Sequence, residues 1–377
     1  MIEPLLALDV GSTKVACAVG IPRGRAPGFE LLGASLIAYP TAPDGWLSDP
    51  LTVGQAIEQA VDATGVGGGH SRALVTFSHP ALASEQIRCA VTLGDEPVAI
   101  RAQDLQRLEA RALDHALAAD REPLVVVRLG CSGNGFEGVK DPRGLPATRL
   151  IGWFHIVTMP AAARRALVQA VESAGFEVAQ VTLGLVAAHA DAAHGGDTPR
   201  RTLVIDAGGL SIQVGCFCDG ALARLEVLPW GGLSIAGEIA KELRVTTEQA
   251  TTWSLEGDAC RKADVRSLIE QRRRLLGEGI ERLLGDQPRP ERLLLFGRAA
   301  LADGFAEWLE ARSGVRTVLC RSERASRLGD VAGQVGLSQA IGLLELATST
   351  QGPPSANGHR LVDRLIHRTR TLLTEYF

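Results

Sequence analysis

Residues 203–243 read LVIDAGGLSIQVGCFCDGALARLEVLPWGGLSIAGEIAKEL, and this stretch decides the fold. A short apolar run, residues 203–205, stops at Asp206, and Gly208 and Gly209 follow. A carboxylate at a strand end beside a glycine turn suits a metal-phosphate site. The turn exposes backbone N–H groups to a phosphate, and the carboxylate can hold the hydrated metal ion.

The remainder of the stretch predicts two more strands and a helix. An Asp-Gly pair at residues 219–220 favours a hairpin turn between strands at residues 212–217 and 222–228. Gly231 and Gly232 then precede apolar residues at helical spacing.

The N-terminus repeats the arrangement. Residues 5–8 are apolar, Asp9 ends the run, and residues 15–19 resume a strand. The turn between the two runs consists of Gly11, Ser12, Thr13 and Lys14. Two strand-Asp-Gly hairpins, one near each end of the core, predict a duplicated two-lobed fold in which both hairpins face one ligand.

Length and composition exclude several classes of protein. The chain has 377 residues, which predicts two to four domains. Its net charge of −4 argues against a nucleic-acid-binding protein. The seven cysteines are scattered and mostly lie in apolar runs, which indicates buried thiols in a reducing compartment. No signal peptide or long apolar run is evident, so we expect a cytosolic body.

Residues 73–158 do not fit a simple duplicated core. They contain strand patterns, a predicted helix at residues 103–118, and the octapeptide GVKDPRGL at residues 138–145. One proline and two glycines make the octapeptide a fixed turn.

The C-terminal segment has the pattern of a detached amphipathic helix. Residues 348–358, TSTQGPPSANG, have the composition of a flexible linker. Residues 359–377 place apolar side chains on one broad helical face, with arginines at its edges or on the opposite side. The alternative is a final helix packed on the core, but the linker and the apolar C-terminus favour membrane binding. The residues expected at the membrane are Arg360, Leu361, Leu365, Ile366, Arg368, Leu372, Leu373, Tyr376 and Phe377.

The two hairpins resemble the phosphate loops of the superfamily of actin, heat-shock chaperone ATPases and sugar kinases. More narrowly, the chain resembles FtsA, the actin-like bacterial division protein that tethers FtsZ to the membrane. The octapeptide turn, the Gly231-Gly232 helix start and the tail carry this resemblance, which covers nearly the whole chain. It implies an α/β, actin-like two-lobed ATPase fold with an FtsA-type inserted subdomain 1C and a C-terminal amphipathic helix.

The resemblance also implies a domain organisation. FtsA usually has a longer subdomain 2B that includes strands and binds the FtsZ tail, so a short 2B leaves that contact in doubt. The implied segments are subdomain 1A (1–72 and 159–196), 1C (73–158), 2A (197–243 and 289–347), a shortened 2B (244–288), the linker (348–358) and the membrane-targeting helix (359–377).

A nucleotide site between the lobes follows from the same resemblance. ATP would bind with Mg²⁺, which Asp9 and Asp206 would hold through water. The remaining cofactor-binding residues implied are Gly11, Ser12, Thr13, Lys14, Gly208, Gly209, Ser211, Gly231, Gly232 and Gly297. No catalytic residue stands out.

Several positions depart from the FtsA pattern. Leu210 and Gln213 replace a glycine and a carboxylate of the second loop, and Arg298 replaces a glycine of the adenine turn. Where a Glu and a Lys usually contact the nucleoside, the alignment places Ala250 and Trp253, and Trp253 could stack on a base or fill its space. These changes predict a pocket that binds ATP weakly or not at all and hydrolyses it poorly, so the protein is at most a weak ATPase.

The resemblance therefore implies a structural adaptor at the cytoplasmic face of the inner membrane, at the division site. Its partners would be an FtsZ-like filament, anionic lipid, and, through subdomain 1C, other division proteins or the next protomer of a self-polymer. One alternative is a pilus-assembly scaffold like PilM, which needs no amphipathic tail. Another is a sugar or acetate kinase, but no catalytic carboxylate is evident for that role.

Overall fold

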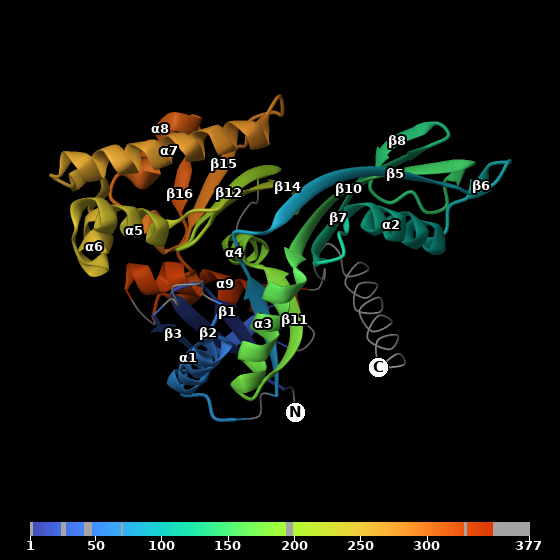
Figure 1. The fold of residues 1–377 in the computed structure, drawn as a ribbon. Coiled ribbons are helices and arrows are strands. Elements are labelled where there is room, and N and C mark those ends of the chain that lie inside the picture. Colours follow the sequence, from blue (N-terminus) through green and yellow to red (C-terminus); the bar gives the residue numbers. More distant parts are fainter. Residues whose placement is uncertain are drawn as a thin grey trace. The chain divides into compact units, whose positions relative to one another are not determined.

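The computed structural model describes residues 3–23, 28–40, 47–68, 71–193, 199–327 and 330–349. Within these ranges the chain forms two compact units (Figure 1). One unit comes from parts of residues 1–82 and 161–350, and the other, the insert, from residues 83–160. The predicted amphipathic helix, residues 359–377, lies outside the described residues and remains a prediction.

The first lobe of the larger unit is a five-stranded sheet of order β11-β4-β1-β2-β3. β1 is parallel to β4 and antiparallel to β2, and its residues Leu6, Ala7 and Leu8 are fully buried. A central strand covered on both faces requires such a continuous apolar run. The strands are β1 (Leu5–Val10), β2 (Lys14–Pro22), β3 (Phe29–Ala38), β4 (Arg72–Phe77) and β11 (Glu177–Leu183). The helices are α1 (Pro50–Ala63), α3 (Ala161–Ser173), α4 (Gly184–Ala193) and α9 (Val331–Thr348).

The second lobe repeats this topology with the strand order β14-β13-β12-β15-β16. β12 is parallel to β15 and antiparallel to β13, as β1 is to β4 and β2. The duplicated fold predicted from the two hairpins is therefore confirmed. The strands are β12 (Arg201–Ala207), β13 (Ile212–Cys218), β14 (Ala221–Leu228), β15 (Arg292–Phe296) and β16 (Thr317–Leu319).

Helices α5 to α8 belong to this lobe, and α5, α6 and α7 share a small core of their own. No strand occurs between α5 and α8 except β15, so the described residues 244–288 are helical, as the sequence predicted. These elements are α5 (Gly232–Leu243), α6 (Thr247–Glu256), η1 (Gly257–Ala259), α7 (Ala263–Leu284), η2 (Arg298–Leu301), α8 (Phe305–Ser313) and η3 (Glu323–Ala325).

Two helices, α4 and α9, pack against each other between the two sheets (Figure 1). Their closest approach is at Gly342, where an added Cβ would lie 1.8 Å from the carbonyl oxygen of Ala187. Only glycine permits this distance, because any other residue would push the helix backbones apart.

The insert is a separate four-stranded sheet of order β5-β10-β7-β8 with α2 packed on one face. Leu108 of α2 contacts the sheet at Gly152, where an added Cβ would lie 2.7 Å from the leucine Cδ2. The elements are β5 (Ala83–Thr92), β6 (Val98–Ala99), α2 (Ala102–Ala116), β7 (Arg121–Gly133), β8 (Phe136–Val139), β9 (Pro146–Ala147) and β10 (Arg149–Pro160).

Two boundaries differ from the sequence-based expectation. Residues 73–77, assigned to the insert, belong to β4 and pair with β1 in the first lobe, because their apolar side chains complete its core. The predicted octapeptide turn begins within β8, and Gly144, its seventh residue, has a φ of +85°. In the described part of the chain, no helix is long and apolar enough to cross a bilayer.

Candidate functional site

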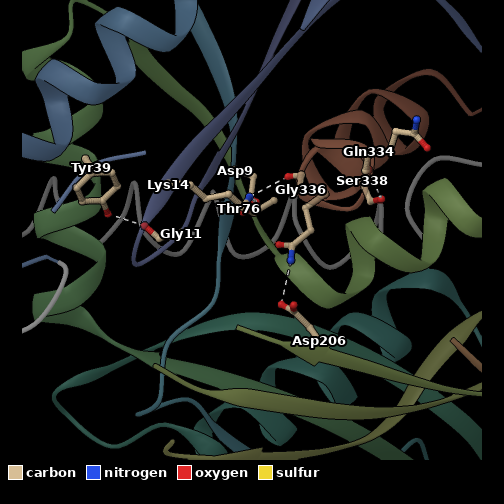
Figure 2. A network of polar contacts seen from close by, with 10 residues as sticks. Asp9, Gly11, Lys14, Tyr39, Thr76, Asp206, Gln334, Gly336 and Ser338 are labelled. Atoms are coloured by element: carbon tan, nitrogen blue, oxygen red, sulfur yellow. Dashed lines mark hydrogen bonds and ion pairs between the residues drawn. The ribbon is translucent and has the colours of Figure 1, made fainter. Parts of the chain in front are cut away.

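Asp9, at the end of β1, is held by two side chains (Figure 2). The Nζ of Lys14 lies 2.5 Å from Asp9 Oδ2, and the hydroxyl of Thr76 donates to Oδ1 at 2.6 Å. Lys14 also donates to the carbonyl oxygen of Gly336 in α9, at 2.8 Å. Both carboxylate oxygens of Asp9 are thus engaged within the first lobe.

Tyr39 fixes the first loop from outside the sheet (Figure 2). Its hydroxyl donates to the carbonyl oxygen of Gly11 at 2.5 Å. Its backbone N–H donates to the carbonyl oxygen of Thr13 at 3.1 Å. Burial, together with the charge of Asp9, raises the pKa of Tyr39 above its usual value, so the phenol remains a donor.

Asp206, at the equivalent point of the second hairpin, has a different environment (Figure 2). The side-chain amide of Gln339 donates to Asp206 Oδ2 at 2.9 Å. Burial, and then the charge of Asp9, raise the pKa of Asp206 to about 6. Gln213 is paired directly opposite on β13, is 1% exposed, and makes no side-chain hydrogen bond with the described residues.

The two hairpin loops touch across the gap between the lobes. A Cβ on Gly209 would lie 2.5 Å from the hydroxyl oxygen of Ser12. A Cβ on Gly231 would lie 2.4 Å from the carbonyl oxygen of Gly208 and 2.6 Å from that of Gly209. The glycines therefore let two loops and a helix start approach one another, which is the role such residues have in phosphate-binding loops.

A cavity of about 70 Å³ lies between the loops. Both hairpin aspartates line it, as do Leu210, Arg298 and Gln339. Two buried polar atoms at one end, the hydroxyl oxygen of Ser78 and Oε1 of Gln339, have no hydrogen-bond partner among the described residues. Such atoms mark a position for water or for a polar ligand.

A larger, mostly apolar cavity of about 280 Å³ adjoins the first. Thr13, Gly208, Gly209 and Arg298 line both cavities, so the two form one continuous site. The size and lining are those of a small-molecule site. Its apolar walls come from Trp230, Ile235, Leu255, Ile269, Leu276 and Phe305.

Three arginines give the larger cavity its charge, and no described acidic residue lines it. Arg272 pairs with Glu238 and stacks on Trp230, with its Cζ 5.5 Å from the ring centre. Arg273 is buried and lies 2.6 Å from Asp258, yet its Nε has no partner among the described residues. Arg273 therefore brings a buried N–H without a described partner to the wall of the cavity.

The site residues expected from the sequence divide into three groups. The small cavity is lined by Asp9, Gly11, Ser12, Thr13, Lys14, Asp206, Gly208, Gly209, Ser211 and Gly297. Gly232 lines the larger cavity, whereas Gly231 packs beneath the second loop. The membrane residues of the tail lie outside the described ranges.

Neither Ala250 nor Trp253, the residues aligned with the usual nucleoside contacts, lines either cavity. Ala250 and Trp253 belong to the core shared by α5, α6 and α7, where Trp253 stacks with Lys262 at 4.4 Å. The same helix presents Thr251, Ser254 and Leu255 to the cavity. Trp253 therefore packs against the core of these helices, on a different side of α6 from the residues that line the cavity.

Sequence reasoning missed Gln339, Ser78, Arg272 and Arg273. Gln339 lies 133 positions from Asp206, and the arginines lie within a charged helix without a local signal. The one sequence signal for a ligand site in this part of the chain was the Gly231-Gly232 pair that follows Trp230.

Comparison with known proteins identifies the insert. Residues 80–158 match the family described as the SHS2 domain inserted in FTSA. The chain is FtsA-like. Its curated relatives include cell division proteins FtsA: that of Pseudomonas aeruginosa is 26% identical over 259 residues, and that of Escherichia coli K12 is 22% identical over 241 residues.

The similarity is partial in length. The two matches cover 65% and 63% of this chain but only 59% and 56% of the FtsA proteins. The FtsA-like chain therefore spans little more than half of the relatives it matches.

Solved structures support the actin-like fold. A PilM-PilN type IV pilus biogenesis complex aligns with 90% of this chain and 97% of the matched chain, at a TM-score of 0.67 and 15% identity. MreB5 of Spiroplasma citri bound to ADP aligns with 90% of this chain and 95% of the matched chain, at a TM-score of 0.50 and 10% identity. At these identities the likeness shows the fold alone.

Proposed function

We propose that this FtsA-like protein is an adaptor that attaches an FtsZ-like filament to the cytoplasmic face of the inner membrane at the division site. The observation that carries the proposal is the insert. It matches the family described as the SHS2 domain inserted in FTSA, and it leaves the first lobe after β4 and returns to it at α3. The insert would contact other division proteins or the next copy of this chain.

Membrane attachment is assigned to residues 359–377, whose apolar face would bury in the interface while its arginines meet anionic lipid. Liposome flotation tests this with the full chain and a chain ending at Ser349. The structure sets that end point, because Ser349 donates to the carbonyl oxygen of Glu345 and completes α9. Only the full chain should float, and equal flotation of both chains would remove the assignment.

The filament contact is proposed for a groove between α5 and α7. Leu268 and Leu275 give it an apolar strip, and charges of both signs flank the strip, which suits a short amphipathic peptide. The charged residues are Glu238, Lys241, Glu242 and Arg272. Leu275→Ser should weaken co-sedimentation with FtsZ, whereas Val331→Ser, a similarly exposed residue on α9, should not. Equal behaviour of the two variants would exclude this groove.

The adjoining cavities are proposed to bind a nucleotide, with phosphates at the hairpin loops and the nucleoside between α6 and α7. Glycines that allow close approach and the free Nε of Arg273 support this proposal. With Gln213 where the family has a carboxylate, we expect slow hydrolysis at most. Tight ATP binding with rapid turnover that Asp206→Asn abolishes would contradict that expectation.

A second candidate is a pilus-assembly scaffold, favoured by the alignment with the PilM-PilN complex over 90% of this chain. Such a protein would be positioned by a membrane partner and would not depend on its own tail. Deletion of residues 359–377 in cells discriminates: an FtsA-like adaptor should leave the membrane, and a PilM-like scaffold should remain there.

A further inference from the structure

The donor set at the phosphate cavity is a poor match for a divalent cation. Mg²⁺ keeps several waters and is usually held by one or two free carboxylates together with the phosphates. Here the ammonium of Lys14 lies 2.5 Å from Oδ2 of Asp9, and Thr76 occupies Oδ1. A hydrated cation would have to displace an ion pair that is almost fully buried.

The second hairpin does not provide a free carboxylate in place of that of Asp9. One oxygen of Asp206 accepts an N–H from Gln339, a donor group that competes with a metal ion. The residue paired opposite Asp206 is Gln213, a neutral amide. Within the described residues, no group of three or more His, Cys, Asp or Glu side chains could hold a metal ion.

Positive charge for a phosphate chain is nevertheless present. Arg298 lines both cavities and follows Gly297, whose φ of +87° forms a turn against the Asp206 strand. Arg272 and Arg273 each pair with a carboxylate, but Arg298 makes no ion pair or hydrogen bond with any described residue. A free guanidinium at the junction of a nucleoside cavity and a phosphate cavity is placed for bidentate phosphate binding.

We propose that this chain binds nucleoside di- and triphosphates without a divalent cation, with Arg298 supplying the positive charge. The inference rests on the proposed nucleotide binding and specifies how that site neutralises the phosphates. Arg298 is then a binding residue that compensates for the engaged carboxylate of Asp9.

Calorimetric titration of the full chain with ADP and with adenosine, in Mg²⁺ or in EDTA, tests the proposal. Wild-type affinity for ADP should differ less than about twofold between the two conditions. Arg298→Gln should weaken ADP binding by about 10- to 100-fold, the range for a lost charge-assisted bond, and leave adenosine nearly unaffected. Arg298→Lys should recover part of the ADP affinity.

The control is Arg289→Gln, an exposed arginine of the same lobe outside both cavities, which should bind ADP like wild type. Wild-type ADP binding at least about tenfold tighter with Mg²⁺ would overturn the inference. The inference would also be wrong if Arg298→Gln kept its affinity for ADP, or if it lost as much affinity for adenosine as for ADP. If the wild type binds no ADP in either condition, both this inference and the proposed nucleotide site are wrong. Liposome flotation and co-sedimentation with FtsZ would still test the proposed adaptor function.

Discussion

Asp9 and Asp206 occupy equivalent positions in two hairpins of identical register. Asp9 pairs with Ala16 and Asp206 with Gln213, in each case seven residues further along the chain. Their side chains nevertheless have different partners, an ammonium and a hydroxyl for Asp9 and an amide for Asp206. The duplicated backbone thus carries two distinct polar environments that substitutions can separate.

Gln213 tests the environment around Asp206. Its buried amide makes no hydrogen bond with the described residues, so Gln213→Met should stabilise the protein by about 1–3 kcal/mol in denaturant unfolding. The matched contrast is Thr76→Val, which removes a satisfied buried hydroxyl and should cost about 1–3 kcal/mol. A loss of stability in Gln213→Met would show that ordered water satisfies the amide.

Gly231 tests the contact between the second loop and α5. In Gly231→Ala the new methyl group would clash with two backbone carbonyls, so we expect a loss of about 1–3 kcal/mol in thermal unfolding and weaker nucleotide binding. Gly237→Ala is the control within α5, because no atom lies within 4 Å of its added Cβ. That variant should gain up to about 1 kcal/mol from helix propensity. Equal effects of the two substitutions would contradict the close approach at Gly231.

Gly342 tests the crossing of α4 and α9 between the lobes. Gly342→Ala should destabilise the larger unit by about 3 kcal/mol or more, since backbone rather than a flexible side chain blocks the methyl group. Gly333→Ala in the first turn of α9 has only Asp330 nearby, at 3.4 Å, and should be tolerated. Differential scanning calorimetry of both variants measures the difference, and a well-tolerated Gly342→Ala would require a looser helix crossing.

Two titrating residues on α4 should give opposing pH dependences. Burial raises the pKa of Asp191 to about 7, although the hydroxyl of Ser322 donates to it, so stability is lost as pH rises from about 4 to about 7. Burial lowers the pKa of His189 to about 4, so stability is lost as pH falls from about 6.5 to about 4. The two slopes partly cancel in the wild type.

Asp191→Asn separates these contributions. Relative to wild type, the variant should gain stability as pH rises from about 4 to about 7, reaching roughly 2–4 kcal/mol above pH 7. Denaturant unfolding across this range measures the difference, with the exposed Asp120→Asn as the control. A constant difference at all pH values would mean that Asp191 does not titrate in this window.

The sequence by itself determined the local elements. Apolar runs ending in Asp-Gly turns predicted both hairpins, and helical periodicity predicted α1, α2 and α7, because these signals lie between residues close in the chain. The octapeptide turn pointed to the FtsA-like insert for the same reason. The first strand of that assignment was wrong, since pairing of β4 with β1 joins residues more than 60 positions apart.

Only the tertiary structure decided the composition of the site. Which face of α6 meets the cavity depends on how α5 and α7 pack, so Thr251 and Ser254 line it and Trp253 does not. The bond from Gln339 to Asp206 joins residues 133 positions apart and has no signature in either segment. Long-range packing sets such contacts, because a side chain's partners depend on the relative placement of whole elements rather than on its neighbours in the chain.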